Sequence, residues 1–142
     1  MATQMYVNLP VKDLDKSVEF FTRLGFSFNP QFTNENATCM IVGEDSFVML
    51  LVESFFQTFT PKKIADAAQS TEVLICLSCQ SRDKVVEMAD QAVAAGGTTP
   101  IAPKDHGFMY QHGFQDLDGH LWELVYMDAS AMPGCPAKTD HS

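Results

Sequence analysis

A short motif occurs twice in this chain, and the repeat restricts the possible folds more than any other feature. Residues 15–19 read D-K-S-V-E and residues 83–87 read D-K-V-V-E, which gives an offset of 68 positions (83 − 15). The turns before the last predicted strand of each half, at Asp45 and Gly119, give an offset of 74 (119 − 45). Repetition at a fixed spacing predicts two copies of one supersecondary unit.

The predicted elements follow the same order twice: one strand, one helix and three strands. Apolar residues at helical spacing predict a helix from Leu14 to Leu24, with Asp13 as its N-cap and Gly25 after its end. The first unit covers about residues 4–53, with strands at 5–9, 27–32, 37–42 and 46–52. The second covers about residues 72–127, with strands at 72–79, 98–102, 108–115 and 120–127 and a helix between Ser81 and Gly96.

A connector at residues 54–71 joins the two units, and Thr60 followed by Pro61 predicts a short helix there, to about Ala68. We therefore expect residues 1–128 to form a single α+β domain of two βαβββ repeats, and residues 129–142 to form a flexible tail. One helix covers only one face of each sheet, so the other faces should curl toward each other. The resulting cup is a usual place for a small ligand.

The charge balance excludes some partners. The net charge is −9, with 18 acidic residues against 9 basic ones, so we expect no binding to nucleic acid. No apolar run is long enough to span a bilayer and no basic leader precedes the first strand, so we expect no membrane partner. Cys76 and Cys79 would point to opposite faces of one strand and thus share neither a metal nor a disulfide. Free thiols indicate the cytoplasm.

Several short motifs resemble the vicinal oxygen chelate superfamily, which groups glyoxalases, bleomycin resistance proteins and extradiol dioxygenases. They are L-P-V-K-D-L at 9–14, S-V-E-F-F at 17–21, L-G-F at 24–26, Q-D-L-D-G-H at 115–120 and L-W-E-L at 121–124. The resemblance implies the curled antiparallel sheet cup of that fold. It also implies a homodimer, with each cup closed either within one chain or between two chains.

The resemblance further implies where a metal would bind. Metal-dependent members of this superfamily carry one ligand on the first and one on the last strand of each unit, which here are Tyr6, Met49, Leu74 and Glu123. Leucine cannot coordinate a metal, and a thioether is a poor ligand for hard divalent ions. One carboxylate does not hold a catalytic metal, so we predict no metal and no other cofactor. His106 or His112 could supply further ligands only in an unusual register.

The same strands predict the residues of a pocket. If Glu123 faces the cup, strand alternation places Tyr6, Asn8 and Met49 there as well, and we include Leu74, which corresponds to Tyr6 on the first strand of the second unit, among the ligand-binding residues. Tyr110 and His112 share a face of the neighbouring strand, which is either the inner or the outer one. Phe56 either roofs the cup or packs beneath the connector. Glu123 acts either as a general base, the one catalytic residue we predict, or as a partner of Tyr6.

Two classes of function follow. The first is a glyoxalase- or bleomycin-resistance-like protein that binds a small organic molecule, cationic or aromatic, without the metal centre. The alternative is a metal-dependent isomerase of the lactoylglutathione lyase type, or a dioxygenase. Whether the protein is an enzyme stays open at this point.

Overall fold

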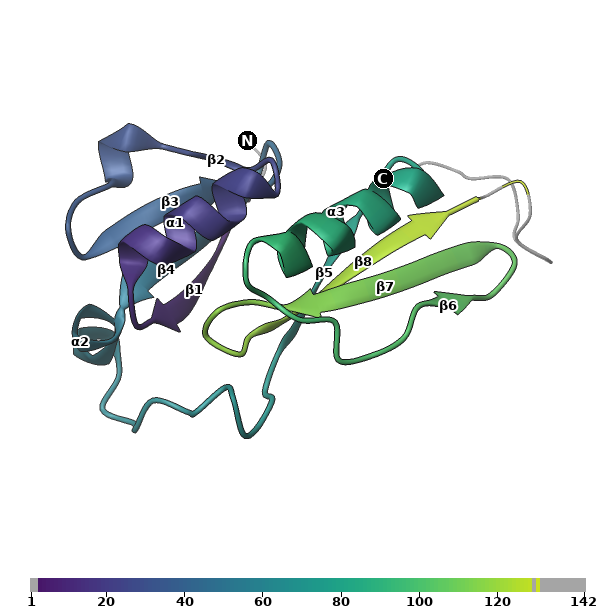
Figure 1. Ribbon diagram of the computed structural model, residues 1–142. Helices are drawn as coiled ribbons and strands as arrows, with labels where there is room; N and C mark the ends of the chain where they lie inside the picture. The colour runs from purple at the N-terminus through teal and green to yellow at the C-terminus, as the bar shows by residue number, and fades with distance from the viewer. Residues whose placement is uncertain (1–2, 129, 131–142) are drawn as a thin grey trace.

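The computed structural model describes residues 3–128 and Ser130, and it contains two four-stranded sheets, which lie side by side in Figure 1. The first unit consists of β1 (Met5–Val11), α1 (Leu14–Arg23), β2 (Ser27–Phe28), β3 (Ala37–Ile41) and β4 (Ser46–Val52). The second consists of β5 (Leu74–Ser78), α3 (Arg82–Ala94), β6 (Lys104–Asp105), β7 (Met109–Gln115) and β8 (Leu121–Met127). The expected tail lies, apart from Ser130, outside the described residues.

The two sheets have the same topology. Their strand orders are β1-β4-β3-β2 and β5-β8-β7-β6, which confirms the two βαβββ units and the α+β class. The expectation of purely antiparallel sheets is wrong, because β1 runs parallel to β4 and β5 runs parallel to β8. The helix carries the chain back across the sheet, so the second strand of each unit starts in the same direction as the first. Two hairpin reversals follow, and the last strand is therefore parallel to the first.

The residues that pair between strands in the two sheets are related by the same offsets as the sequence repeat. Asn8 pairs with Met49 in the first sheet, and Cys76 pairs with Glu123 in the second. These pairs are related by the offsets of 68 (76 − 8) and 74 (123 − 49) that the sequence gives. The first and last strands of each unit are therefore related residue by residue between the two units.

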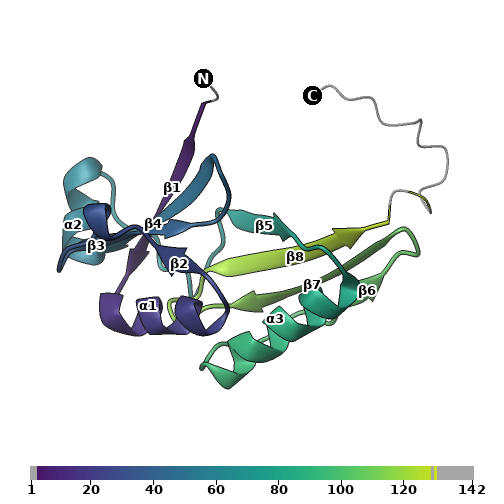
Figure 2. The same cartoon turned by 90° about the horizontal axis from the view of Figure 1, so that it is seen from above.

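Both helices lie on the same side of the two sheets (Figure 2). Asp13 and Ser81 cap them as expected, each accepting from a backbone N–H three residues later at 3.1 Å. One buried cluster joins the two units, because Phe20 and Phe21 of α1 contact Phe114 and Trp122 of the second sheet. The core thus lies between helices and sheets, and the opposite sheet face remains for a ligand.

Three predicted segments differ from the structure. The connector helix at 61–68 is absent, and the helical turns come earlier, as α2 (Glu53–Phe56) and the 3₁₀ turn η2 (Gln57–Phe59). The strand at 27–32 ends at Phe28 because Pro30 starts a second 3₁₀ turn, η1 (Pro30–Phe32). The strand at 98–102 is reduced to a single bridge between Thr98 and Gln115, since Pro100 cannot donate to a ladder.

Within residues 3–128, none of the helices has the length and apolar character needed to cross a membrane.

Candidate ligand-binding site

The face of the sheets that points away from the helices, called the open face below, carries the candidate site. On β8, Trp122 and Leu124 are buried in the core, so the side chain of Glu123 between them lies on the open face. On β1, Leu9 is buried, and its neighbour Asn8 lies on the open face. The same alternation places Tyr6, Met49 and Leu74 on this face, as the sequence predicts.

A cavity of about 100 Å³ lies beside Glu123 on the second sheet. Its residues come from β5, β7, β8 and the segment before β6. They are Leu74, Pro100, Ile101, Ala102, Lys104, Gln111, His112, Gly113, Phe114, Leu121, Trp122 and Glu123. No hydrogen bond or ion pair engages the Glu123 carboxylate within the described part of the chain. The cavity therefore offers one unpaired carboxylate in a largely apolar wall.

The thiol nearest to this carboxylate is a poor nucleophile. Cys76 pairs with Glu123 across β5 and β8, and its side chain is exposed on the open face. Burial, and then the negative charge of Glu123, raise the pKa of the Cys76 thiol. The thiol thus stays protonated at neutral pH, which disfavours covalent catalysis by this residue.

A second cavity, of about 250 Å³, lies between the two units and the connector. Asn8 and Phe56 line it, together with residues 70–73 and Leu121, which also lines the cavity beside Glu123. Phe56 is half-buried there, whereas Phe59 is 68% exposed. We expect Phe56 either to roof the cup or to pack beneath the connector. Its position in the wall of this cavity supports the second interpretation.

Tyr110 and His112 lie on the helix-facing side of β7, not on the open face. Tyr110 packs against the core, with the guanidinium of Arg82 4.8 Å from its ring centroid. His112 reaches the edge of the cavity, and its Nδ1 is buried with no hydrogen-bond partner in the described residues. Tyr6 does not pair with Glu123, because its ring stacks on Phe47 at 4.8 Å and its hydroxyl donates to Gln4 Oε1.

The four positions that correspond to metal ligands in the superfamily do not fit a divalent metal. Among Tyr6, Met49, Leu74 and Glu123, only the last is a usual ligand. Across residues 3–128 and Ser130, no three His, Cys, Asp or Glu side chains come together in a way that could hold an ion. His106 and His112 do not complete such a group with Glu123.

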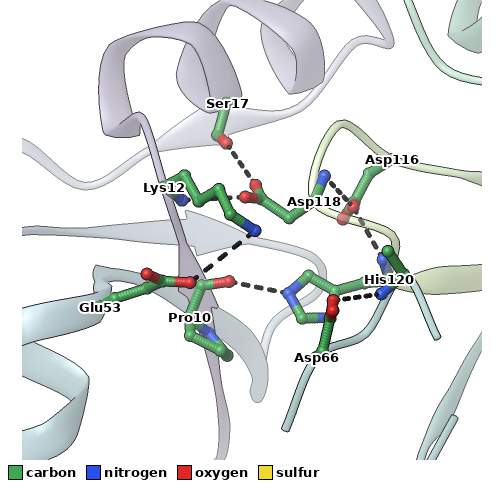
Figure 3. A network of polar contacts seen from close by, with 9 residues as sticks. Pro10, Lys12, Ser17, Glu53, Asp66, Asp116, Asp118 and His120 are labelled. Atoms are coloured by element: carbon green, nitrogen blue, oxygen red, sulfur yellow. Dashed lines mark hydrogen bonds and ion pairs between the residues drawn. The ribbon is translucent and has the colours of Figure 1, made fainter. Parts of the chain in front are cut away.

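A polar network that the sequence analysis missed fixes the turn before β8 (Figure 3). Asp116 is buried, and it accepts hydrogen bonds from the backbone N–H groups of Asp118 and His120 and from Trp122 Nε1 at 2.9, 3.0 and 3.0 Å. Burial raises the pKa of Asp116, against the opposing effects of His120 and these bonds. The His120 ring donates to the Pro10 carbonyl oxygen at 2.8 Å, which ties the turn to the first unit.

The comparisons with known proteins agree with this architecture. Residues 3–43 match the family model described as bleomycin resistance protein-like N-terminal. None of the curated proteins matches the sequence. A hypothetical protein from S. aureus is 29% identical, with a TM-score of 0.75 over 89% of this chain and 95% of that one.

Two further structures are more distant in sequence. A glyoxalase/bleomycin resistance protein/dioxygenase family enzyme from Burkholderia phytofirmans has 17% identity and a TM-score of 0.74, covering 89% of this chain and 99% of its own. A fosfomycin resistance protein from Listeria monocytogenes has 20% identity and a TM-score of 0.61, covering 89% and 93%. The fold is thus that of the glyoxalase/bleomycin resistance/dioxygenase proteins. The match at residues 3–43 agrees with the resemblance of the sequence motifs to the vicinal oxygen chelate superfamily.

Proposed function

We propose that this protein binds a small organic molecule with a cationic group in the cavity beside Glu123, without the metal centre of its metal-dependent relatives. The observation that carries the proposal is the unpaired Glu123 carboxylate in an apolar wall formed by Leu74, Ile101 and Leu121. A carboxylate in such a wall orients a ligand by one charged contact, and the apolar residues supply contact area.

The character of the ligand follows from the charges around the cavity. The chain carries a net charge of −9, which raises the local concentration of cations. Lys104 also lines the cavity and has no ion-pair partner in the described residues. A ligand with a cationic group and a hydrogen-bond acceptor could contact Glu123 with the first and Lys104 with the second.

Benzylammonium, a small aromatic cation, tests the proposal. We expect its addition to shift the backbone amide resonances of Glu123, Leu121 and Leu74 in a saturable way. The Glu123→Gln variant keeps the shape of the side chain and removes the charge, so it should weaken binding about tenfold or more. The matched control is Glu87→Gln on the exposed surface of α3, which should bind as the wild type does. Equal affinity in the wild type and Glu123→Gln would refute the proposal.

The homodimer that the resemblance implies, and a location in the cytoplasm, stay predictions. Light scattering of the purified protein measures the first. If the chain is a dimer, the same benzylammonium titration gives the number of sites per chain and shows whether dimerisation alters the cavity.

A further inference from the structure

The edge of β7 beside the candidate site is incomplete. At one end Thr98 and Gln115 exchange two backbone hydrogen bonds, at 3.1 and 2.7 Å, and at the other end Lys104 pairs with Gln111. The chain takes six steps from 98 to 104 but only four from 111 to 115, so residues 99–103 cannot follow the ladder. Two extra residues make this segment bulge away from β7, with a gap in the ladder between its ends.

Gly113 lies in the middle of this gap. The backbone groups of a strand alternate between its two edges, and those of Gln111 and Gln115 point toward residues 98–104. The N–H and C=O groups of Gly113 therefore point into the gap as well. No backbone hydrogen bond joins them to residues 99–103, although both ends of the ladder are closed.

The sequence explains why the gap stays open. Pro100 and Pro103 both fall in the bulged segment, and neither has an N–H to donate. Continuing the ladder from Thr98 would place Pro100 opposite Gly113. That pairing would leave the Gly113 carbonyl without a donor. Extending the ladder would therefore add few hydrogen bonds to this segment.

In the first unit, the residue that corresponds to Gly113 has a hydrogen-bond partner on the neighbouring segment. Cys39 corresponds to Gly113 at the offset of 74 (113 − 39), and the two residues pair with Met49 and Glu123, respectively. The Cys39 carbonyl accepts a hydrogen bond from the Asn29 N–H at 2.9 Å. The open edge at Gly113 is therefore a departure from the repeat and not a property of the unit.

The gap opens into the cavity beside Glu123, which Gly113, Ile101 and Leu74 line. We propose that the ligand of this cavity presents an amide N–H and an amide C=O on one side, as a residue of an added strand or a lactam does, and that these groups pair with the C=O and N–H groups of Gly113. This inference rests on the proposed function and specifies its ligand class. The amide binds at the edge, the apolar part of the ligand contacts Ile101 and Leu74, and its cationic group meets Glu123.

Hydrogen exchange in the free protein gives the first test. The amide of Gly113 should exchange at least about a hundredfold faster than the amides of Gln111 and Gln115, which lie on the same strand and whose backbone groups are paired. Strong protection of Gly113 in the free protein would mean that the edge is already closed, and would overturn the inference.

The second test uses three probes observed by amide resonances: N-acetyl-leucine N-methylamide, δ-valerolactam, and the acetyl-leucine compound with both amide N–H groups methylated. We expect the first two to slow exchange of Gly113, and the methylated compound to bind about tenfold more weakly. Preference for the linear probe indicates a peptide-like ligand, and preference for the lactam indicates a cyclic one. Equal binding of the methylated compound would overturn the inference.

Benzylammonium, which has no amide, separates this inference from the proposed function. If it binds and the amide probes do not, the cavity binds cations and the edge has no role. If no probe binds, both proposals fail. A variant that lacks Thr99 and Ala102 gives both sides of the gap four steps and places Ile101, which has an N–H to donate, opposite Gly113, so the ladder can close. It should lose the amide probes, and their retention would place the amide elsewhere.

Discussion

The carboxylate of Asp118 accepts a 2.8 Å hydrogen bond from the backbone N–H of Lys12, although the two residues are 106 positions apart. The second carboxylate oxygen accepts from Ser17 Oγ at 3.3 Å (Figure 3). The turn before β8 thereby attaches to the start of α1. The contact joins the two units at the end of the core and does not belong to the candidate site.

Asp118→Ala should therefore lower the free energy of unfolding by about 1–2 kcal/mol, because two hydrogen bonds between the units are lost. Urea unfolding followed by circular dichroism measures the change. Asp90→Ala is the matched control, since Asp90 is exposed on α3 and has no hydrogen-bond or ion-pair partner in the described residues. Equal stability of the two variants would show that the contact contributes nothing.

Gly119→Ala should lower the stability of the fold more than Asp118→Ala does. Gly119 has a φ of 94°, and an added Cβ would lie 2.8 Å from the Ala68 backbone nitrogen. The left-handed conformation alone costs about 1–2 kcal/mol for a residue with a side chain, and the contact with the connector adds to this cost. Gly43→Ala, where an added Cβ meets nothing within 4 Å, should change the melting temperature little. A variant at 119 as stable as the one at 43 would contradict the close packing of the connector on the turn.

The buried carboxyl of Asp116 predicts a specific pH dependence. Burial raises its pKa in the folded state above the value of about 3.8 that it has in the unfolded chain. The folded state thus holds the proton more strongly, so this group lowers stability as the pH rises from about 3.8 through the raised pKa. The Asp116→Asn variant lacks this titration. Its stability relative to the wild type should therefore rise over that range of pH, in melting curves measured from pH 3 to 7.

That comparison has a constant offset, because asparagine cannot accept every bond that the carboxylate accepts. This offset does not depend on pH. The test is therefore the change with pH of the stability difference between the variant and the wild type. A parallel pair of stability curves would show that Asp116 does not titrate differently in the folded protein.

Phe56→Ala should lower the melting temperature by several degrees, since the half-buried ring lines the cavity beneath the connector. Phe59→Ala removes an equally large ring that is 68% exposed, and it should have a much smaller effect. Calorimetry of both variants gives the comparison. An unchanged curve for Phe56→Ala would favour its other interpretation, a roof over a ligand site.

Titration of the chelator-stripped protein with nickel and zinc should show no site of micromolar affinity. Only Glu123 among the four corresponding positions is a suitable ligand. Substituting Tyr6→His, Met49→Glu and Leu74→His together supplies the missing ligand types and should create metal binding that the wild type lacks. One tight site per wild-type chain would instead favour the metal-dependent isomerase or dioxygenase, which an assay with methylglyoxal and glutathione would then test.

The sequence by itself determined the parts of this protein that depend on neighbouring residues and on the repeat. Apolar spacing and the caps Asp13 and Ser81 define both helices, because capping acts within three residues. The offsets of 68 and 74 relate the paired positions of the two sheets, and alternation around Trp122 places Glu123 on the open face.

Only the tertiary structure decided the features that require distant residues to meet. The bond from Trp122 to Asp116, the attachment of Asp118 to Lys12, and the orientation of Tyr110 and His112 toward α3 follow from packing between elements. The open edge at Gly113 likewise depends on how residues 98–104 meet β7. Local patterns do not encode these pairings, because each one is set by the balance of packing and hydrogen bonding in the assembled fold.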